Sequence, residues 1–345
     1  MGQKEALFSD LKEISSLVKE GNDSFYLGVT LGLYARHYSR THHFDMAQSY
    51  LNQAWTILDS QDLPSLQARL YNTGGVIEFF QQADQKAIFF FQKGLDACRR
   101  FGNLRDEARI MSNLGLLYSR RGQFAEAVQC HTHALQLHHK LKNYTHFPNV
   151  LCNLAEVYRI QGQLQPALQL YLKGLSIIQQ TGTHDVMEIF KGNIGLLYCE
   201  LDRFDDAHRY LNTAVDRLLE RQIKGIAGIF MGGIAFTYLK QASSLNSSTL
   251  HSSANSIQSE TGYQRAQDAF EKANDYFNST PNFAAERAQF WVKWALLNYQ
   301  LRRRTRWIKP ALRLTKDVLQ TESHIELSLL AKQLKKVIKR KARQT

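Results

Sequence analysis

Cysteine and proline are scarce in this sequence. Four cysteines and five prolines occur among 345 residues, and no two cysteines are close enough in sequence to form the pairs of a zinc ribbon or a redox dithiol. We therefore expect small buried thiols and a reducing, cytoplasmic setting. Four of the prolines fall near the predicted first turns of helices, where proline is tolerated, so a mostly α-helical chain is predicted.

Long apolar runs are missing as well. Charged residues interrupt the first 13 positions, so no cleavable signal is expected. The longest uncharged stretch that is mainly apolar, residues 226–239, is shorter than the roughly 18 to 20 residues that cross a bilayer. No membrane span is predicted.

Enzyme motifs are absent from the sequence. It contains no Gly-rich phosphate loop ending in Gly-Lys-Ser/Thr, no His-Glu-x-x-His and no Gly-x-Ser-x-Gly. His131 and His138 could share a helix face as metal ligands, but His131 also occupies a position expected to pack between helices. Several glycines between 225 and 233 have no strand before them, which favours close helix packing over nucleotide binding. We predict no catalytic residue, metal site or cofactor.

Acidic residues are few at the C-terminal end. From Leu301 onward, 14 Lys or Arg face three acids, while the remainder of the chain is almost neutral. The cations singled out there are Arg302, Arg303, Arg304, Arg306, Lys335, Lys336, Lys339 and Arg340. Three roles remain open: a solubilising cap, a site for nucleic acid or an acidic protein, and a contact with an anionic membrane surface.

The strongest pattern in the sequence is a fixed period of 40 residues. One series consists of Tyr38, Tyr118, Tyr158, Tyr198 and Tyr238. A second series, nine positions later, consists of Ala47, Ala87, Ala127, Ala167 and Ala207. Two series with the same step indicate stacked structural repeats.

Within the period, residues 113–118, 153–158 and 193–198 read NLGLLY, NLAEVY and NIGLLY. A turn and then an aromatic residue or leucine follow each motif. This pattern resembles the tetratricopeptide repeat, in the 40-residue variant of kinesin light chains and spindle-orientation adaptors, over about residues 22–320. The resemblance implies an all-α, right-handed superhelical solenoid of antiparallel helix pairs, with about six to seven repeats and terminal capping helices.

The residues themselves support helix pairs. A small residue at Gly115, Ala155 or Gly195 lets a neighbouring helix approach closely, and the alanine series does the same for each second helix. A single pair cannot bury its apolar side, so the pairs must stack. The expected segments are a capping helix at 1–21, repeats at 22–240, a flexible Ser/Asn-rich insertion at 241–262, degenerate repeats at 263–321 and a basic helix at 322–345.

The resemblance also implies a binding site. In similar repeat proteins the position of Asn113, Asn153 and Asn193 faces the concave groove and bonds the backbone of an extended peptide, a task suited to a carboxamide because it both donates and accepts. The alternatives are consensus filler and a helix-to-helix hydrogen bond. Further residues expected to line the groove are Arg109, Asn149, Glu156, Arg120 and Arg159.

We therefore predict a non-enzymatic scaffold or adaptor that binds an extended or helical segment of another protein. One alternative is a subunit that binds nucleic acid or an acidic partner through the basic C-terminal end. Another is a bacterial peptide-sensing regulator of similar repeat architecture.

Overall fold

The computed structural model describes residues 24–40, 43–59, 64–142, 144–182, 186–247, 253–302, 304–321 and 325–341. All regular secondary structure within these ranges is helical. The chain divides into two compact units, Met1–Val157 and Tyr158–Thr345. The capping helix expected at 1–21 lies outside the described residues.

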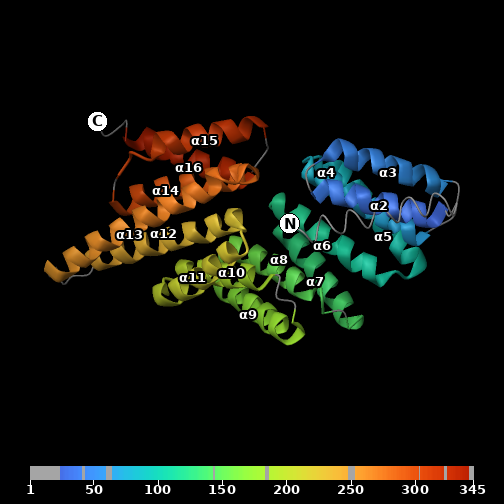
Figure 1. The fold of residues 1–345 in the computed structure, drawn as a ribbon, viewed down its shortest axis with the longest axis horizontal. Helices are drawn as coiled ribbons and strands as arrows, with labels where there is room; N and C mark the ends of the chain where they lie inside the picture. Colours follow the sequence, from blue (N-terminus) through green and yellow to red (C-terminus); the bar gives the residue numbers. More distant parts are fainter. Residues whose placement is uncertain are drawn as a thin grey trace. The chain divides into compact units, whose positions relative to one another are not determined.

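The first unit is built of helix hairpins in which α2 packs on α3, α4 on α5 and α6 on α7 (Figure 1). Its helices are α2 (Ser24–Arg40), α3 (Phe44–Asp59), α4 (Pro64–Phe80), α5 (Asp84–Phe101), α6 (Leu104–Arg120) and α7 (Phe124–Lys140). Helix α8 (Phe147–Ile160) begins in this unit, and its last residues belong to the second.

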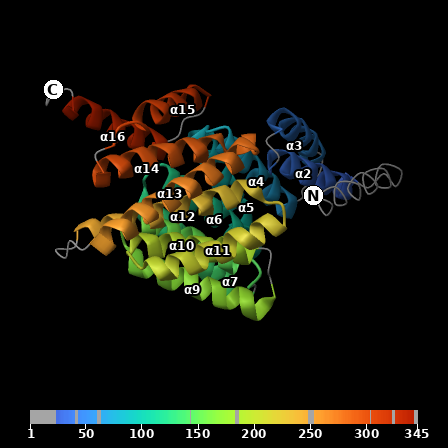
Figure 2. The same cartoon turned by 60° about the vertical axis from the view of Figure 1, so that its left-hand side comes forward.

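The second unit continues in the same way. It holds α9 (Leu164–Thr181), α10 (Met187–Glu200), α11 (Phe204–Glu220), α12 (Lys224–Ser247), α13 (Ser253–Asn278), a short 3-10 helix (Pro281–Phe283), α14 (Ala284–Arg302), α15 (Ile308–Thr321) and α16 (Ile325–Lys341). Helices α12 and α13 run side by side over much of their length (Figures 1 and 2).

Small residues hold the two helices of a hairpin together, as predicted. The five alanines of the 40-residue series are fully buried. A β-carbon added to a glycine of the first helix would lie 2.5 to 2.7 Å from a side chain of the second. These pairs are Gly75 with Phe91, Gly115 with His131 and Gly195 with Leu211.

A second set of small residues, not recognised from the sequence, acts between successive hairpins. A β-carbon on Gly94 of α5 would come within 2.8 Å of Ile110 in α6, and one on Gly174 of α9 within 2.3 Å of Phe190 in α10. Each glycine therefore accepts a large side chain of the next hairpin, so contacts within and between hairpins use the same small-to-large packing.

The turns repeat with the helices. Residues with positive φ recur every 40 positions in two series, which are Gln82, Gly122, Gly162 and Asp202, and Gly102, Lys142, Gly182 and Gln222. Left-handed backbone ends a helix by turning the chain back toward it, and glycine adopts it without steric cost. Four of the eight positions carry a side chain nevertheless.

Residues 241–262 were predicted to form a flexible Ser/Asn-rich insertion, but the residues that the structure describes there are helical. Helix α12 continues to Ser247, and α13 already begins at Ser253. Ser259 is buried and donates a 2.9 Å hydrogen bond to the carbonyl oxygen of Ala242. Ser243 bonds to Leu239 in its own helix. Small polar residues thus extend the hairpin because they let two helices touch and satisfy their hydroxyls on backbone carbonyls.

The apolar stripe of α16 is covered. Leu327 and Leu334 are fully buried in a cluster with residues of α14 and α15, and Leu330 and Val337 pack against that cluster. This arrangement supports the role of α16 as a cap on the last hairpin. None of the helices that the structure describes is long and apolar enough to cross a membrane.

Candidate peptide-binding site

The first helices of three successive hairpins, α2, α4 and α6, lie next to one another in the first unit. Side chains from all three line a pocket. Its apolar part consists of Val29, Leu33, Leu66 and Leu70. Its polar part consists of Arg36, Arg69, Asn72, Thr73 and Arg109.

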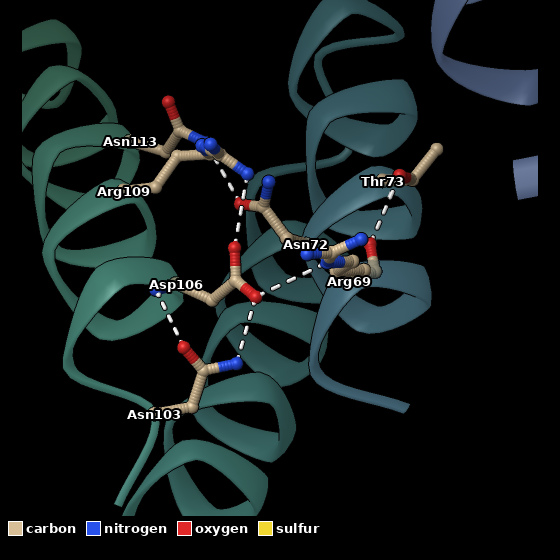
Figure 3. A network of polar contacts seen from close by, with 7 residues as sticks. All are labelled: Arg69, Asn72, Thr73, Asn103, Asp106, Arg109 and Asn113. Carbon is tan, nitrogen blue, oxygen red and sulfur yellow. Dashed lines mark hydrogen bonds and ion pairs between the residues drawn. The ribbon is translucent and has the colours of Figure 1, made fainter. Parts of the chain in front are cut away.

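Asp106 organises the polar side of this pocket (Figure 3). Its side chain is 4% exposed and accepts hydrogen bonds from Arg69 Nε at 3.3 Å and Arg109 Nη1 at 2.9 Å. Asn103 donates a third bond at 2.8 Å and, as the N-cap of α6, accepts the backbone N–H of Asp106. One buried carboxylate therefore fixes two guanidinium groups, one from α4 and one from α6.

Asn113 makes a helix-to-helix hydrogen bond. Its Nδ2 atom donates to Oδ1 of the buried Asn72 at 2.8 Å, which joins α6 to α4 beside the arginines (Figure 3). Thr73, at the position that corresponds to Asn113 one repeat earlier, bonds instead to the carbonyl oxygen of Arg69 in its own helix. For Asn113 the helix-to-helix alternative foreseen from the sequence is thus realised.

The other predicted groove residues lie on α8 and α10. Asn153 and Glu156 of α8 are half-buried, and Asn149 is exposed. Asn193 is half-buried on α10 in the second unit. The asparagine ladder stays a prediction.

Arg120 and Arg159 are engaged by neighbouring helices. Arg120 donates to the carbonyl oxygen of Phe79 at 2.6 Å, pairs with Asp84 and lies 3.9 Å from the centre of the Phe79 ring. Arg159 donates to Glu200 at 2.6 Å. Both side chains therefore already serve contacts between hairpins, and their role in selectivity stays a prediction.

His131 packs between the helices of its hairpin, as the period predicts. It is fully buried, its ring lies against Gly115, and burial lowers its pKa from 6.5 to about 4. Neither ring nitrogen has a hydrogen-bond partner among the described residues. Within the same residues, no group of three or more His, Cys, Asp or Glu side chains could hold a metal ion.

Positive charge near the pocket contributes to the lowered pKa values of two further histidines. Burial, followed by the charges of Arg109, Arg36 and Arg105, lowers the pKa of His146. Burial, His146 and Arg109 lower the pKa of His138 in the same direction. Both imidazoles therefore favour the neutral form, and the cationic character here comes from arginine.

The basic residues near the C-terminus are partly engaged. Arg302 lies 3.5 Å from the centre of the Tyr263 ring, and Arg306 donates to Gln267 at 3.2 Å. Arg304, Lys335 and Lys336 are exposed. Arg303 and the side chains of Lys339 and Arg340 lie outside the described residues.

Comparison with known proteins agrees with this architecture. The tetratricopeptide repeat family matches residues 66–139 and 147–220. These two segments consist of tetratricopeptide repeats. The matched segments contain all of α5, α6, α8, α9, α10 and α11 and nearly all of α4 and α7, whereas the pocket draws on α2 as well. No curated protein sequence matches the chain significantly.

Several solved structures share the fold over most of the chain. A Rap protein complexed with Competence and Sporulation Factor is 15% identical, with a TM-score of 0.64 and coverage of 99% of this chain and 95% of that one. NprR in complex with its cognate peptide NprX is 14% identical, with a TM-score of 0.60 and 98% coverage of both chains. Aspartyl phosphate phosphatase F from Bacillus subtilis is 11% identical, with a TM-score of 0.62 and coverage of 87% and 73%.

Proposed function

We propose that this repeat protein is a non-enzymatic scaffold that holds an extended peptide segment on the first helices of its hairpins. The observation that carries the proposal is the pocket on α2, α4 and α6, where apolar side chains lie beside the amide of Asn72 and the guanidinium groups of Arg69 and Arg109. An extended chain offers what such a surface can bind, namely unpaired backbone N–H and C=O groups and alternating side chains.

Asn153 and Asn193 extend the proposal along the repeats. Both occupy the position of Asn113 in later hairpins, and a carboxamide can accept from a peptide N–H and donate to a peptide carbonyl. Contacts of this kind bind the peptide backbone whatever the peptide sequence, so selectivity depends on the neighbouring side chains.

A bacterial peptide-sensing regulator is the more specific form of this proposal. NprR, which has the same fold over 98% of both chains, was solved with its cognate peptide, and the Rap protein with Competence and Sporulation Factor. These likenesses support a peptide ligand, and the partner of this chain has to be found by experiment.

Peptide binding is tested with an array of end-blocked decapeptides of random sequence, probed with the full-length protein. We expect a subset of spots to bind, and Asn153→Ala to weaken the strongest binders by about three- to tenfold, as for one lost hydrogen bond. Asn212→Ala, which removes an exposed asparagine from α11, is the matched control. Absence of any bound peptide would reject the proposal.

The basic C-terminal end suggests nucleic acid as an alternative ligand, and salt separates the two. Phosphate contacts lose orders of magnitude in affinity between 50 and 200 mM salt, whereas amide contacts to a peptide change much less. A steep loss that disappears when the chain is cut before Leu301 would favour the alternative.

A further inference from the structure

The charged side chains that line the pocket on α2, α4 and α6 are all positive. Three arginines line it, Arg36, Arg69 and Arg109, and none of the described residues that line it is acidic. The nearby Asp106 is buried and already accepts from two of these arginines and from Asn103. Positive charge at the pocket therefore exceeds negative charge.

The arginines keep donors for a ligand. Arg69 bonds to Asp106 through Nε and Arg109 through Nη1, which leaves further N–H groups on each planar guanidinium. The Arg69 side chain is 54% exposed and that of Arg109 34% exposed. Because Asp106 holds one edge of each group, the remaining edges are pre-oriented, and less entropy is lost when they bind a carboxylate.

Aliphatic side chains line the same pocket. Val29 and Leu33 of α2 border it together with Leu66 and Leu70 of α4, and Leu33 is 37% exposed although it is a large aliphatic residue. A ligand that matches both kinds of lining carries a carboxylate next to an apolar side chain.

We propose that this pocket selects an acidic segment of the bound peptide, with an Asp or Glu side chain between Arg69 and Arg109 and a neighbouring aliphatic side chain against Leu33 and Leu66. The inference rests on the proposed function, since it names the peptide class that the same surface prefers. An Asp or Glu side chain is the expected source of the carboxylate, because in the proposed function the peptide runs past the pocket along the first helices. A C-terminal carboxylate is the competing source, and the experiment has to separate the two.

The test starts from the decapeptide array, whose peptides are blocked at both ends. We expect the bound sequences to be enriched in Asp or Glu beside Leu, Ile, Val or Met. The strongest binder is then resynthesised with a fluorescent label in three forms: end-blocked, end-blocked with every acid changed to its amide, and the amide form with a free C-terminus. Fluorescence polarisation with the full-length protein should show the acidic form binding about ten- to a hundredfold more tightly than either amide form.

Arg69→Gln with Arg109→Gln should remove this preference, so that acidic and amide peptides bind alike. The matched control is Arg209→Gln with Arg217→Gln, which changes the net charge equally at two exposed arginines of α11 that also pair with acids. It should keep the preference, and melting curves show whether each variant is folded.

Three results would overturn the inference. Bound peptides without enrichment in acids would leave peptide binding standing and remove the acidic selectivity. Tightest binding by the free C-terminus would assign the arginines to a terminal carboxylate. An acidic preference lost equally in the control variant would assign it to general charge. An array without any bound peptide would instead reject the proposed function itself.

Discussion

Nδ2 of Asn113 donates a 2.8 Å hydrogen bond to Oδ1 of Asn72, so that two asparagines in successive hairpins of the first unit bind each other. Asn72 is 6% exposed, so its amide depends largely on protein partners. Removal of the Asn113 amide therefore leaves a buried acceptor without its donor. Asn113, for which a helix-to-helix hydrogen bond was the alternative to a ligand contact, thus supports the fold.

Asn113→Ala should accordingly lower the free energy of unfolding by about 1 to 3 kcal/mol, the cost of an unsatisfied buried polar group. Asn153→Ala is the matched comparison, because Asn153 occupies the repeat position of Asn113. Among the described residues, the Asn153 side chain makes no hydrogen bond. We expect that variant to change stability by less than about 0.5 kcal/mol. Urea unfolding of both variants measures the difference, and equal stabilities would show that the Asn72–Asn113 bond contributes nothing.

Gly195→Leu tests the contact inside a hairpin. A β-carbon at this position would lie 2.7 Å from Leu211, so a larger side chain forces α10 and α11 apart and should cost about 1 to 3 kcal/mol. Ala125→Leu, at an exposed position of α7, provides the control. Thermal unfolding that is identical for the two variants would place Gly195 at the surface.

The hairpins could be predicted from the sequence because small residues recur every 40 positions, and each of them is needed where two helices contact each other. Gly115 and Gly195 were recognised in this way, and both meet a large side chain of the partner helix. The polar network could not be predicted. Asn72 precedes the repeat position of Asn113 by one residue, and whether the two amides meet depends on how the helices are rotated against each other.

Asp106 was missed for a similar reason. Nothing in the pattern distinguishes a buried acid in the first turn of α6 from the surface acids common at helix starts, where the helix dipole favours them. Its role becomes visible only when Arg69 of the preceding hairpin is placed beside it. Composition also misled at residues 241–262, because serine and asparagine are frequent both in loops and where helices pack closely.

The helical extension of α12 and α13 gives a direct test. Replacement of residues 253–262 by an equally long Gly-Ser sequence should lower the melting temperature by several degrees, since it removes the buried Ser259 and introduces glycine into a helix. Glu260→Ala, an exposed position of the same segment, should leave the melting temperature nearly unchanged. If the Gly-Ser variant melts with the parent, residues 253–262 contribute no stability.

Gln222 offers a stabilising substitution. It has a φ of 59° at a turn position that glycine occupies in two other repeats, and its side chain is exposed. Gln222→Gly removes the steric cost of left-handed backbone in the folded protein. This gain exceeds the loss that comes from the higher conformational entropy of glycine in the unfolded chain, so we expect the free energy of unfolding to rise by about 0.5 to 1 kcal/mol. Gln161→Gly, at a turn position without positive φ, should instead be neutral or destabilising when both are unfolded in urea.

His131 should make the fold sensitive to acid. Its pKa is about 4 in the folded protein against the usual 6.5, so below pH 6.5 the unfolded chain binds a proton that the folded chain does not. The stability contributed by neutral His131 is therefore complete above pH 6.5 and is lost as the pH falls toward 4, by about 3 kcal/mol in total. The corresponding residue of a later hairpin, Leu211, packs against Gly195 without a titrating group.

His131→Leu should remove this dependence, because leucine fills a similar volume and leaves no ring nitrogen without a partner. The free energy of unfolding, measured in urea at intervals from pH 7 to pH 4, should fall less steeply for the variant than for the parent, with a difference of about 3 kcal/mol at pH 4. His139→Leu, at an exposed position of the same helix, should keep the parent's slope. Parallel curves for the parent and His131→Leu would mean that the ring is hydrated or partnered in solution, and that burial of His131 does not govern the acid response.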